Sequence, residues 1–368
     1  MVVRSEEREK RVVDQFRTDN AMIYNGDSAE VLAGLKDESV HYSIYSPPFA
    51  SLYTYSNSER DLGNCRSYEE FFEHYSFIVK QLYRVLKPGR LLSFHCMLIP
   101  ASITHDGYMG LKDFRGDLIR CHIGEDAYVM YRSIAMFRAR ADMAETDGDD
   151  GRAGRLRESA SVMELDLKAF PVTGMFNFHS EVVIWKDPLI AATRTHANGL
   201  AHKELVKDSA VSRQGVPDYL VTMRKPGENT EPISHKPSGL SKWIGEESSK
   251  PKGQYHLEPA KNKQSHLIWQ RYASPVWMDI NPSDTLQRES VREAADERHI
   301  CPLQLQVIER GLELWSNPGD VVLSPFAGIG SEIYTAVKMG RRGIGIELKR
   351  SYYQQACANV SAAEKESG

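Results

Sequence analysis

The sequence predicts an α/β fold with a mostly parallel sheet. Short apolar runs alternate with segments of helical spacing at both ends of the chain, and these two parts bracket a less regular middle. Such alternation is typical of a parallel sheet covered by helices, with its strands drawn from distant parts of the chain. Seven apolar runs are expected as strands: 21–24, 39–45, 91–95, 181–185, 219–223, 321–323 and 343–346.

Helix signals support each part of the predicted sheet. Ser67 and Glu70 form a capping-box pattern, apolar residues then recur at helical spacing as far as Leu86, and Pro88-Gly89 is expected to end this helix. A short helix is expected over 29–35. In the C-terminal part, Pro302 is expected to start one helix, and Gly340 to end another that carries Ile333, Tyr334 and Val337.

Composition limits the classes of protein that this chain can be. Its 368 residues are 41% hydrophobic and 26% charged, and no run approaches the roughly 18 apolar residues of a membrane span. The charged N-terminus does not look like a signal peptide, so a cytoplasmic location is expected. The five cysteines are odd in number and lack Cys-x-x-Cys spacing, which argues against a disulfide framework or a structural zinc site. No metal is expected.

The net charge of -4 argues against a nucleic-acid partner, but the charge is unevenly distributed. Residues 186–271 carry 14 basic and nine acidic residues, a net +5, with histidines and aromatic residues interleaved. A basic, aromatic segment suits a nucleic-acid surface, although a solvated linker would have similar composition. The candidate phosphate contacts are Lys252, Lys261, Lys263 and Arg271.

A glycine-rich turn follows the strand predicted at 321–323. In Phe326-Ala-Gly328-Ile-Gly330, the glycines permit close approach of a ligand to the backbone at the start of a helix. Glu347 ends the next strand, where an acidic residue can hold a ribose diol. The third glycine of a dinucleotide site is missing, so a nucleoside without a diphosphate, such as S-adenosylmethionine, fits better than a nicotinamide cofactor. A purely structural turn is the alternative.

A second motif follows the strand predicted at 39–45. In Ser46-Pro47-Pro48-Phe49, two prolines remove backbone donors and stiffen the chain, which leaves carbonyl oxygens free to accept hydrogen bonds. The aromatic side chain offers a stacking face. Such a site can hold a planar base that carries an amine, whereas the motif alone is equally compatible with a simple turn.

Together, the two motifs and their strands resemble those of the amino-methylating DNA methyltransferases, which modify cytosine N4 or adenine N6. The catalytic motif of that family is Asp/Asn/Ser-Pro-Pro-aromatic and its cofactor motif is Asp-Pro-Phe-x-Gly-x-Gly. The order of the motifs here is similar to the β class. The resemblance implies a Rossmann-like, seven-stranded, mostly parallel methyltransferase sheet with a smaller target-recognition region, S-adenosylmethionine as cofactor, and double-stranded DNA as substrate.

The resemblance also implies an organisation along the chain. It places a catalytic part at 20–120, an insertion at 121–177, later strands at 178–226, target recognition at 227–298 and a cofactor-binding part at 299–360. The cofactor-binding residues implied by the motifs are Asp27, Cys301, Pro302, Ser324, Phe326, Ala327, Gly328, Gly330, Ser331 and Glu347. Ser324 replaces the usual Asp of the cofactor motif, and Ser331 stands where Thr is common.

The resemblance implies direct methyl transfer to a flipped base. Ser46 Oγ and the Pro47 carbonyl would accept hydrogen bonds from the amine while Phe49 stacks on the ring, with Pro48 stiffening the turn. Ser-Pro-Pro favours cytosine N4, and adenine N6 remains the alternative. Cytosine C5 chemistry would require a Pro-Cys nucleophile, which the sequence lacks. His95 and Cys96 are interpreted as core or sheet-edge residues.

Rival functions stay open at this point. An RNA or small-molecule methyltransferase could share the fold, and a catalytically silent DNA- or nucleotide-binding module is the rival outside the enzymes. A homodimer and a separate restriction endonuclease are partners that the resemblance suggests.

Overall fold

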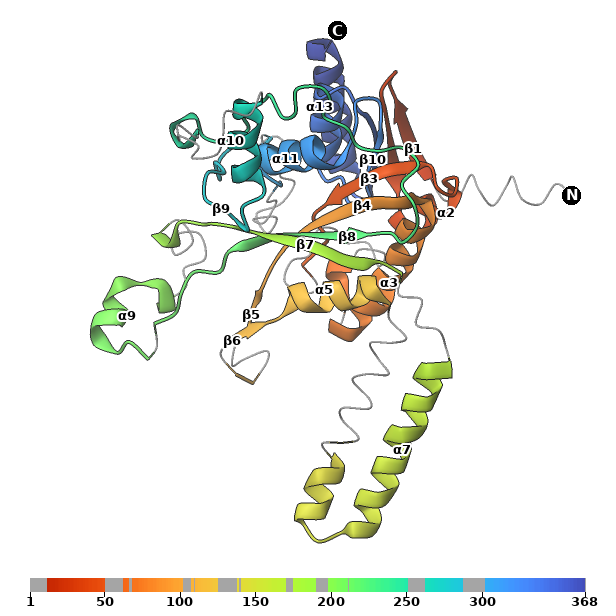
Figure 1. Cartoon of the computed structure of the whole chain (residues 1–368), viewed down its shortest axis with the longest axis vertical. Coiled ribbons are helices and arrows are strands. Elements are labelled where there is room, and N and C mark those ends of the chain that lie inside the picture. Colours follow the sequence, from red (N-terminus) through yellow and green to blue (C-terminus); the bar gives the residue numbers. More distant parts are fainter. Residues whose placement is uncertain are drawn as a thin grey trace, which may run out of the picture.

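The computed structural model describes residues 12–49, 62–65, 68–101, 107–108, 110–124, 138, 140–169, 175–189, 198–210, 212–250, 262–286 and 302–367. Its centre is a nine-stranded sheet in the order β1-β2-β11-β10-β3-β4-β8-β7-β9 (Figure 1). Five neighbouring strands from β2 to β4 run parallel, and β8 and β7 form an antiparallel extension beside β4. The predicted α/β fold with a mostly parallel sheet is therefore confirmed.

The strands have the following bounds: β1 Val12–Arg17, β2 Ala21–Gly26, β3 Val40–Tyr45, β4 Leu86–Met97, β7 Asn177–Ile184, β8 Asp218–Arg224, β9 Val276–Trp277, β10 Val321–Ser324 and β11 Arg342–Glu347. A separate hairpin pairs β5 Ile99–Ala101 with β6 Gly110–Lys112. The main α-helices are α2 Ser28–Gly34, α3 Tyr68–Val85, α5 Phe114–Ile123, α7 Asp150–Ala169, α9 His202–Lys207, α10 Lys263–Tyr272, α11 Leu305–Trp315, α12 Ser331–Lys338 and α13 Arg350–Ser367.

The expected number of seven strands is too low for the observed sheet. All seven predicted strands are present as β2, β3, β4, β7, β8, β10 and β11, and the two additional strands, β1 and β9, lie at the edges. β1 has no buried residue and β9 has two residues in all, so neither gives the apolar run by which a strand is recognised.

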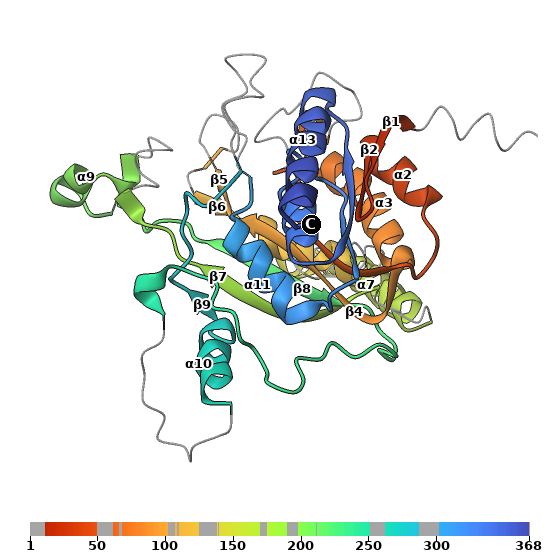
Figure 2. The same ribbon diagram turned by 90° about the horizontal axis from the view of Figure 1, so that it is seen from above.

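Helices cover both faces of the sheet. On one face, α2, α3 and α5 share a core with the sheet that includes Tyr45 and Phe94. On the other face, α11 packs on Tyr42 and Ile44 of β3, and α12 and α13 pack over β2 (Figures 1 and 2). The alternating direction of the β3 side chains thus supplies both layers.

Two helix boundaries differ from the expected ones. α3 ends at Val85, and Leu86 already belongs to β4, where it pairs with Val40 of β3. α11 begins at Leu305 instead of Pro302, because the buried Leu303 fills the core below β3 and the Leu305 N–H bonds to the Asp284 carbonyl (2.8 Å). Ser67, the expected cap of α3, lies outside the described residues.

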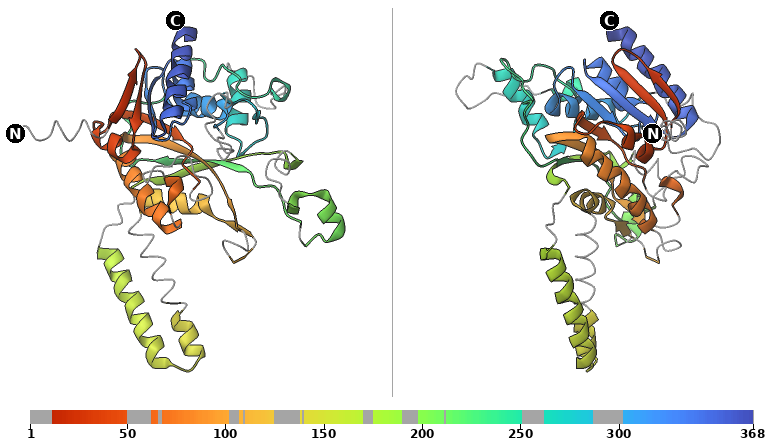
Figure 3. Two further views of the ribbon diagram at one scale, coloured as in Figure 1. Left: turned by 180° about the vertical axis from the view of Figure 1, so that it is seen from behind. Right: turned by 90° about the vertical axis from the view of Figure 1, so that its right-hand side faces the viewer.

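The segment after α5 leaves the body of the protein and returns to the same point. The Met175 and Phe176 N–H groups donate to the carbonyls of Ile123 and His122 at 2.8 and 3.0 Å. α7 projects away from the sheet (Figures 1 and 3). This geometry supports the prediction that 121–177 contains an insertion.

The region between β8 and α11 is joined to the body through Arg310 of α11. This fully buried guanidinium donates to the Ile244 carbonyl (2.6 and 2.9 Å) and to Asp279 Oδ2 (2.7 Å), and it lies over the rings of Tyr272 and Trp277. α10 therefore has a fixed position relative to the catalytic sheet. No helix among the described residues is long and apolar enough to cross a membrane.

Candidate functional site

The predicted motifs meet at one edge of the sheet. Strand pairing aligns Glu347 of β11 with Asn25 of β2, Ser324 of β10 with Gly345 of β11, and Leu323 of β10 with Ser43 of β3. The segments that follow these strands all leave at their carboxyl ends, which is where ligands bind in open α/β sheets. The glycine-rich turn, Asp27 and the Ser46 motif are thus gathered at this edge.

The glycine-rich turn requires glycine for two different reasons. Gly328 and Gly330 have φ of +53° and +86°, in the left-handed region that other residues avoid. A Cβ at Gly330 would also lie 3.0 Å from Ala356 Cβ of α13, whereas a Cβ at Gly328 would meet no atom within 4 Å. Gly330 therefore allows close helix packing, and Gly328 leaves open space beside the turn.

Glu347 holds this turn in place. Its carboxylate accepts from the Gly328 N–H (2.8 Å) and from the Lys349 N–H (2.8 Å), one on each oxygen. Asn25 Nδ2 donates to the Glu347 and Leu348 carbonyls (2.9 and 3.0 Å). Each carboxylate oxygen can accept a second hydrogen bond, so Glu347 can both shape the turn and accept from a ligand hydroxyl.

Asp27 also has a structural contact that the motif did not predict. It is the N-cap of α2, where Oδ1 accepts from the Glu30 N–H at 3.1 Å. One carboxylate oxygen is thus engaged at the helix end. The role expected for Asp27, an approach to the cofactor adenine, stays a prediction.

Two serines beside the turn fit a polar ligand. Ser324 and Ser331 are 0% and 3% exposed, and neither Oγ has a hydrogen-bond partner among the described residues. A buried hydroxyl without a partner is costly, and a ligand that bonds to it removes that cost. The turn, its open space at Gly328 and these hydroxyls fit the amino-acid and ribose groups of S-adenosylmethionine.

The remaining cofactor-motif residues support the turn from below. The Phe326 ring packs against Tyr45 and Tyr75, with centroid separations of 5.9 and 6.4 Å, and the Ala327 N–H donates to the Ile346 carbonyl (2.9 Å). Pro302 is half-buried just before α11. Cys301 lies outside the described residues.

The catalytic motif follows β3 directly. Ser46 is half-buried, Pro47 is buried, and the half-buried Phe49 ring packs at a tilt against Phe114 of α5, with centroids 6.1 Å apart. The ring thus has a fixed backing. Its stacking on a base is a prediction that this position allows.

Sequence reasoning missed three residues beside Ser46. Ser46 Oγ lies 3.2 Å from His95 Nδ1, and His95 Nε2 lies 3.0 Å from Asp218 Oδ2. Lys186 Nζ lies 2.6 Å from Asp218 Oδ1. The side chains at Asp218 are ion pairs by distance, although their angles fall outside those of ideal hydrogen bonds. His95 was interpreted as a core or sheet-edge residue, and its position at the end of the strand after the motif was the available signal.

Of the four predicted DNA contacts, Lys263 and Arg271 lie on α10 and are exposed to solvent. Trp269 of the same helix is 57% exposed. Lys252 and Lys261 lie outside the described residues. The face of α10 thus combines basic groups with an aromatic ring that is accessible to a ligand.

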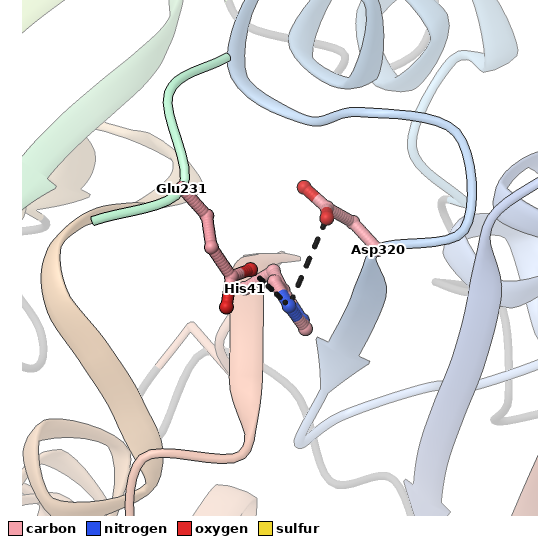
Figure 4. A group of neighbouring side chains, drawn as sticks. All are labelled: His41, Glu231 and Asp320. Carbon is pink, nitrogen blue, oxygen red and sulfur yellow. Dashed lines mark hydrogen bonds and ion pairs between the residues drawn. The ribbon is translucent and has the colours of Figure 1, made fainter. Parts of the chain in front are cut away.

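A group of three residues at the opposite edge could hold a metal ion by its composition. His41, Glu231 and Asp320 converge there (Figure 4). Lys87 Nζ already contacts Glu231 (2.5 Å), and the fully buried Arg90 contacts Asp320 (2.9 Å). Since these two cations supply the positive charge that a metal would bring, we interpret the group as a structural ion-pair cluster.

Comparison with known proteins identifies the relatives of this fold. A family model described as DNA methylase, N6_N4_Mtase, matches residues 40–358. The chain is 24% identical over 356 residues to the type II methyltransferase M.BglI of Bacillus subtilis, covering 92% of this chain and 84% of that protein. It is 21% identical to M.BglII of the same organism, covering 94% and 70%.

Solved structures share the fold. A DNA modification methylase from Thermus thermophilus, TTHA0409, solved in complex with S-adenosyl-L-methionine, has a TM-score of 0.52 at 18% identity and covers 94% of this chain and 95% of its own. The cytosine-N4-specific PvuII DNA methyltransferase has a TM-score of 0.52 at 15% identity, with 95% and 90% covered.

Proposed function

Because the chain belongs to the DNA methylase family of N6/N4 amino-methyltransferases, we propose that it methylates the exocyclic N4 of a flipped cytosine in duplex DNA. The chain is an enzyme that acts on DNA and uses S-adenosylmethionine. The proposal concerns the target base and the residues that act on it. The observation that carries it is the placement of Ser46 and the glycine-rich turn at one edge of the sheet, after the paired strands β3 and β10.

The exocyclic amine of a base is a poor nucleophile, because its lone pair is delocalised into the ring. Ser46 Oγ and the Pro47 carbonyl are the acceptors that would hold its N–H groups and direct the nitrogen lone pair toward the methyl group. Phe49, backed by Phe114, would hold the ring plane. Correct positioning of the two reactants supplies much of the rate enhancement in a direct transfer.

The cofactor site is proposed around the turn at 326–330. S-adenosylmethionine supplies an electrophilic methyl group on a positively charged sulfur. The buried hydroxyls of Ser324 and Ser331, which lack a partner among the described residues, and the second lone pairs of Glu347 are the protein groups that would bind and orient it. Asp27 and Pro302 are further predicted contacts.

Cytosine N4 is favoured over adenine N6 by Ser46. Among family members, Ser-Pro-Pro often accompanies action on cytosine, whereas adenine enzymes usually have Asp-Pro-Pro-Tyr. Adenine N6 is the second candidate, because the matching family model includes both activities.

The segment 227–298 is proposed as the DNA-recognition region. Its support is the basic excess of the surrounding 186–271 segment, the exposed Lys263, Arg271 and Trp269 of α10, and the attachment of this region to α11 through Arg310. A homodimer and a separate restriction endonuclease remain predicted partners.

Mass spectrometry of nucleosides tests the target base. Duplex DNA of mixed sequence is incubated with the protein and methyl-deuterated S-adenosylmethionine, then digested to nucleosides. Labelled N4-methylcytosine is expected. Labelled N6-methyladenine alone would replace the cytosine assignment by the adenine one, and binding of the cofactor without transfer to any DNA would indicate a silent binding module.

A further inference from the structure

His95 lies next to the catalytic serine because of strand pairing. Tyr45 at the end of β3 pairs with Phe94 of β4, so the residues that follow them, Ser46 and His95, are neighbours at the sheet edge. Ser46 Oγ is 3.2 Å from His95 Nδ1 and 3.4 Å from the His95 carbonyl. The imidazole is the closer of the two acceptors available to the serine hydroxyl.

The contact on the other ring nitrogen fixes the tautomer of His95. Nε2 faces Asp218 Oδ2 at 3.0 Å, and a carboxylate can only accept, so Nε2 carries the proton. Nδ1 is then a free lone pair that accepts from the Ser46 hydroxyl. With its own hydrogen directed at His95, Ser46 Oγ presents its lone pairs to a donor in the site.

Asp218 is suited to hold this arrangement. It is 2% exposed at the start of β8, and Lys186 Nζ lies 2.6 Å from its second oxygen. Burial acts to raise the pKa of Asp218, but His95 and Lys186 outweigh burial and lower it, so the carboxylate is ionised. A buried anion beside Nε2 stabilises a positive charge on the imidazole.

We propose that His95, held by Asp218 and Lys186, is the positioning residue that orients Ser46 and takes up the proton released during methyl transfer. This inference rests on the proposed function. The amine lone pair forms the N–CH₃ bond, and the sulfur keeps the electron pair of the broken S–CH₃ bond. The methylated nitrogen then gives one N–H proton to Ser46 Oγ as the serine proton passes to His95 Nδ1, and the imidazolium later releases it to solvent.

Other charged groups near this end of β4 form their own pair. Arg115 of α5 contacts Glu181 of β7 at 3.1 Å, with Asp113 beside the same arginine at 3.9 Å. Their charges act on the neighbouring Cys96, together with Asp218. Asp218 and Lys186 are therefore the charges that contact the His95 arrangement directly, and Arg115, Glu181 and Asp113 surround it.

Nitrogen NMR of ¹⁵N-histidine protein tests the geometry without any turnover. The spectrum should show His95 protonated at Nε2 in the wild type, assigned by loss of its signals in H95Q. A His95 protonated at Nδ1 at neutral pH would overturn the proposal, because that nitrogen could not accept from Ser46.

Kinetics of H95Q and D218N test the role in transfer, with H179Q as the control. His179 lies on β7 near its start, toward the opposite end of the β7–β8 pair from Asp218. H95Q should lower kcat about 100-fold, within the range for loss of a proton-transfer group, with the KM for S-adenosylmethionine and the thermal midpoint nearly unchanged. Wild-type kcat should fall at acidic pH, D218N should move this fall to lower pH, and H95Q should lack it.

Two results separate failure of the inference from failure of the proposed function. Methyl transfer by H95Q at the wild-type rate, with an unchanged pH profile, overturns the inference and leaves the methyltransferase assignment intact. If the wild type methylates no DNA base, the proposed function fails, and the NMR tautomer alone then decides whether the His95 arrangement exists.

Discussion

The two ends of the β3 strand carry histidine clusters with similar composition and different surroundings. At its start, His41 Nδ1 accepts from the Val321 N–H (3.0 Å) and Nε2 faces Glu231 (3.1 Å), so protein groups occupy both ring nitrogens. After its end, Nδ1 of His95 faces the Ser46 hydroxyl, and that hydroxyl belongs to the candidate catalytic motif. The partner of the second nitrogen separates a structural histidine from one that can act on a substrate.

The carboxylates of the two clusters differ in the same way. Asp320 neutralises Arg90, whose side chain is 0% exposed, and accepts from the Asn317 N–H. Asp218 holds His95 and the partly exposed Lys186. The cluster at the start of β3 is thus closed by cations from the protein, whereas the cluster at its end leads to the site. Four predictions test this difference.

The largest expected effect is on stability, from Asp320→Asn. The substitution leaves the buried Arg90 without its close counter-charge, and loss of one partner of a buried ion pair costs about 3 kcal/mol or more. Urea unfolding should show this loss, while the folded fraction keeps its methyl-transfer rate. D218N is the matched variant, and a D320N protein with unchanged stability would contradict the structural role of the start-of-strand cluster.

The second prediction concerns Glu332, a buried carboxyl at the site edge. Burial, with the negative charge of Glu347, raises the pKa of Glu332 to about 8. The folded protein therefore binds this proton more tightly than the unfolded chain, and stability falls as pH rises from about 4.5 to about 8. Glu332→Gln should be as stable as wild type near pH 4 and more stable at pH 8, by as much as about 4 kcal/mol.

Thermal or urea unfolding across this pH range provides the measurement. Parallel stability curves for E332Q and wild type would show that Glu332 does not titrate in the folded protein as described.

The third prediction compares two serines of the β3 segment. Ser46→Ala removes an acceptor for the amine and should lower kcat about 100-fold, with the cofactor still bound. Ser43→Ala removes only the hydroxyl that donates to the Leu323 carbonyl (2.9 Å), which should cost about 1 kcal/mol of stability. Single-turnover methyl transfer and urea unfolding distinguish them. Equal activity of S46A and S43A would exclude Ser46 from the chemistry.

The smallest effect is expected on α10. Lys263→Ala and Arg271→Ala together should weaken duplex binding several-fold and reduce the salt dependence of log Kd by about two units of slope, one for each lost phosphate contact. Lys365→Ala on α13 is the control of equal charge chemistry. A salt dependence that K263A/R271A leaves unchanged would place the DNA on another surface.

The sheet and both motifs could be predicted from the sequence, because apolar runs, glycines and prolines carry local signals. Gly330 illustrates this: its positive φ and close contact with Ala356 explain why glycine stands there. The edge strands β1 and β9 gave no such signal.

The His95 arrangement could not be predicted, because it depends on contacts between distant parts of the chain. Met97 of β4 pairs with Asp218 of β8 in an antiparallel register, and this register brings His95 to its carboxylate. No local pattern fixes that alignment. The buried ion pairs of His41 and Asp320 were missed for the same reason.

Methyl transfer by wild type, H41Q and H95Q, measured side by side as labelled N4-methylcytosine in digested DNA, tests the account most directly. The account predicts that wild type and H41Q form this nucleoside at similar rates per folded molecule, while H95Q forms it about 100-fold more slowly. A normal rate for H95Q with a loss for H41Q, or no labelled base from any of the three proteins, would contradict it.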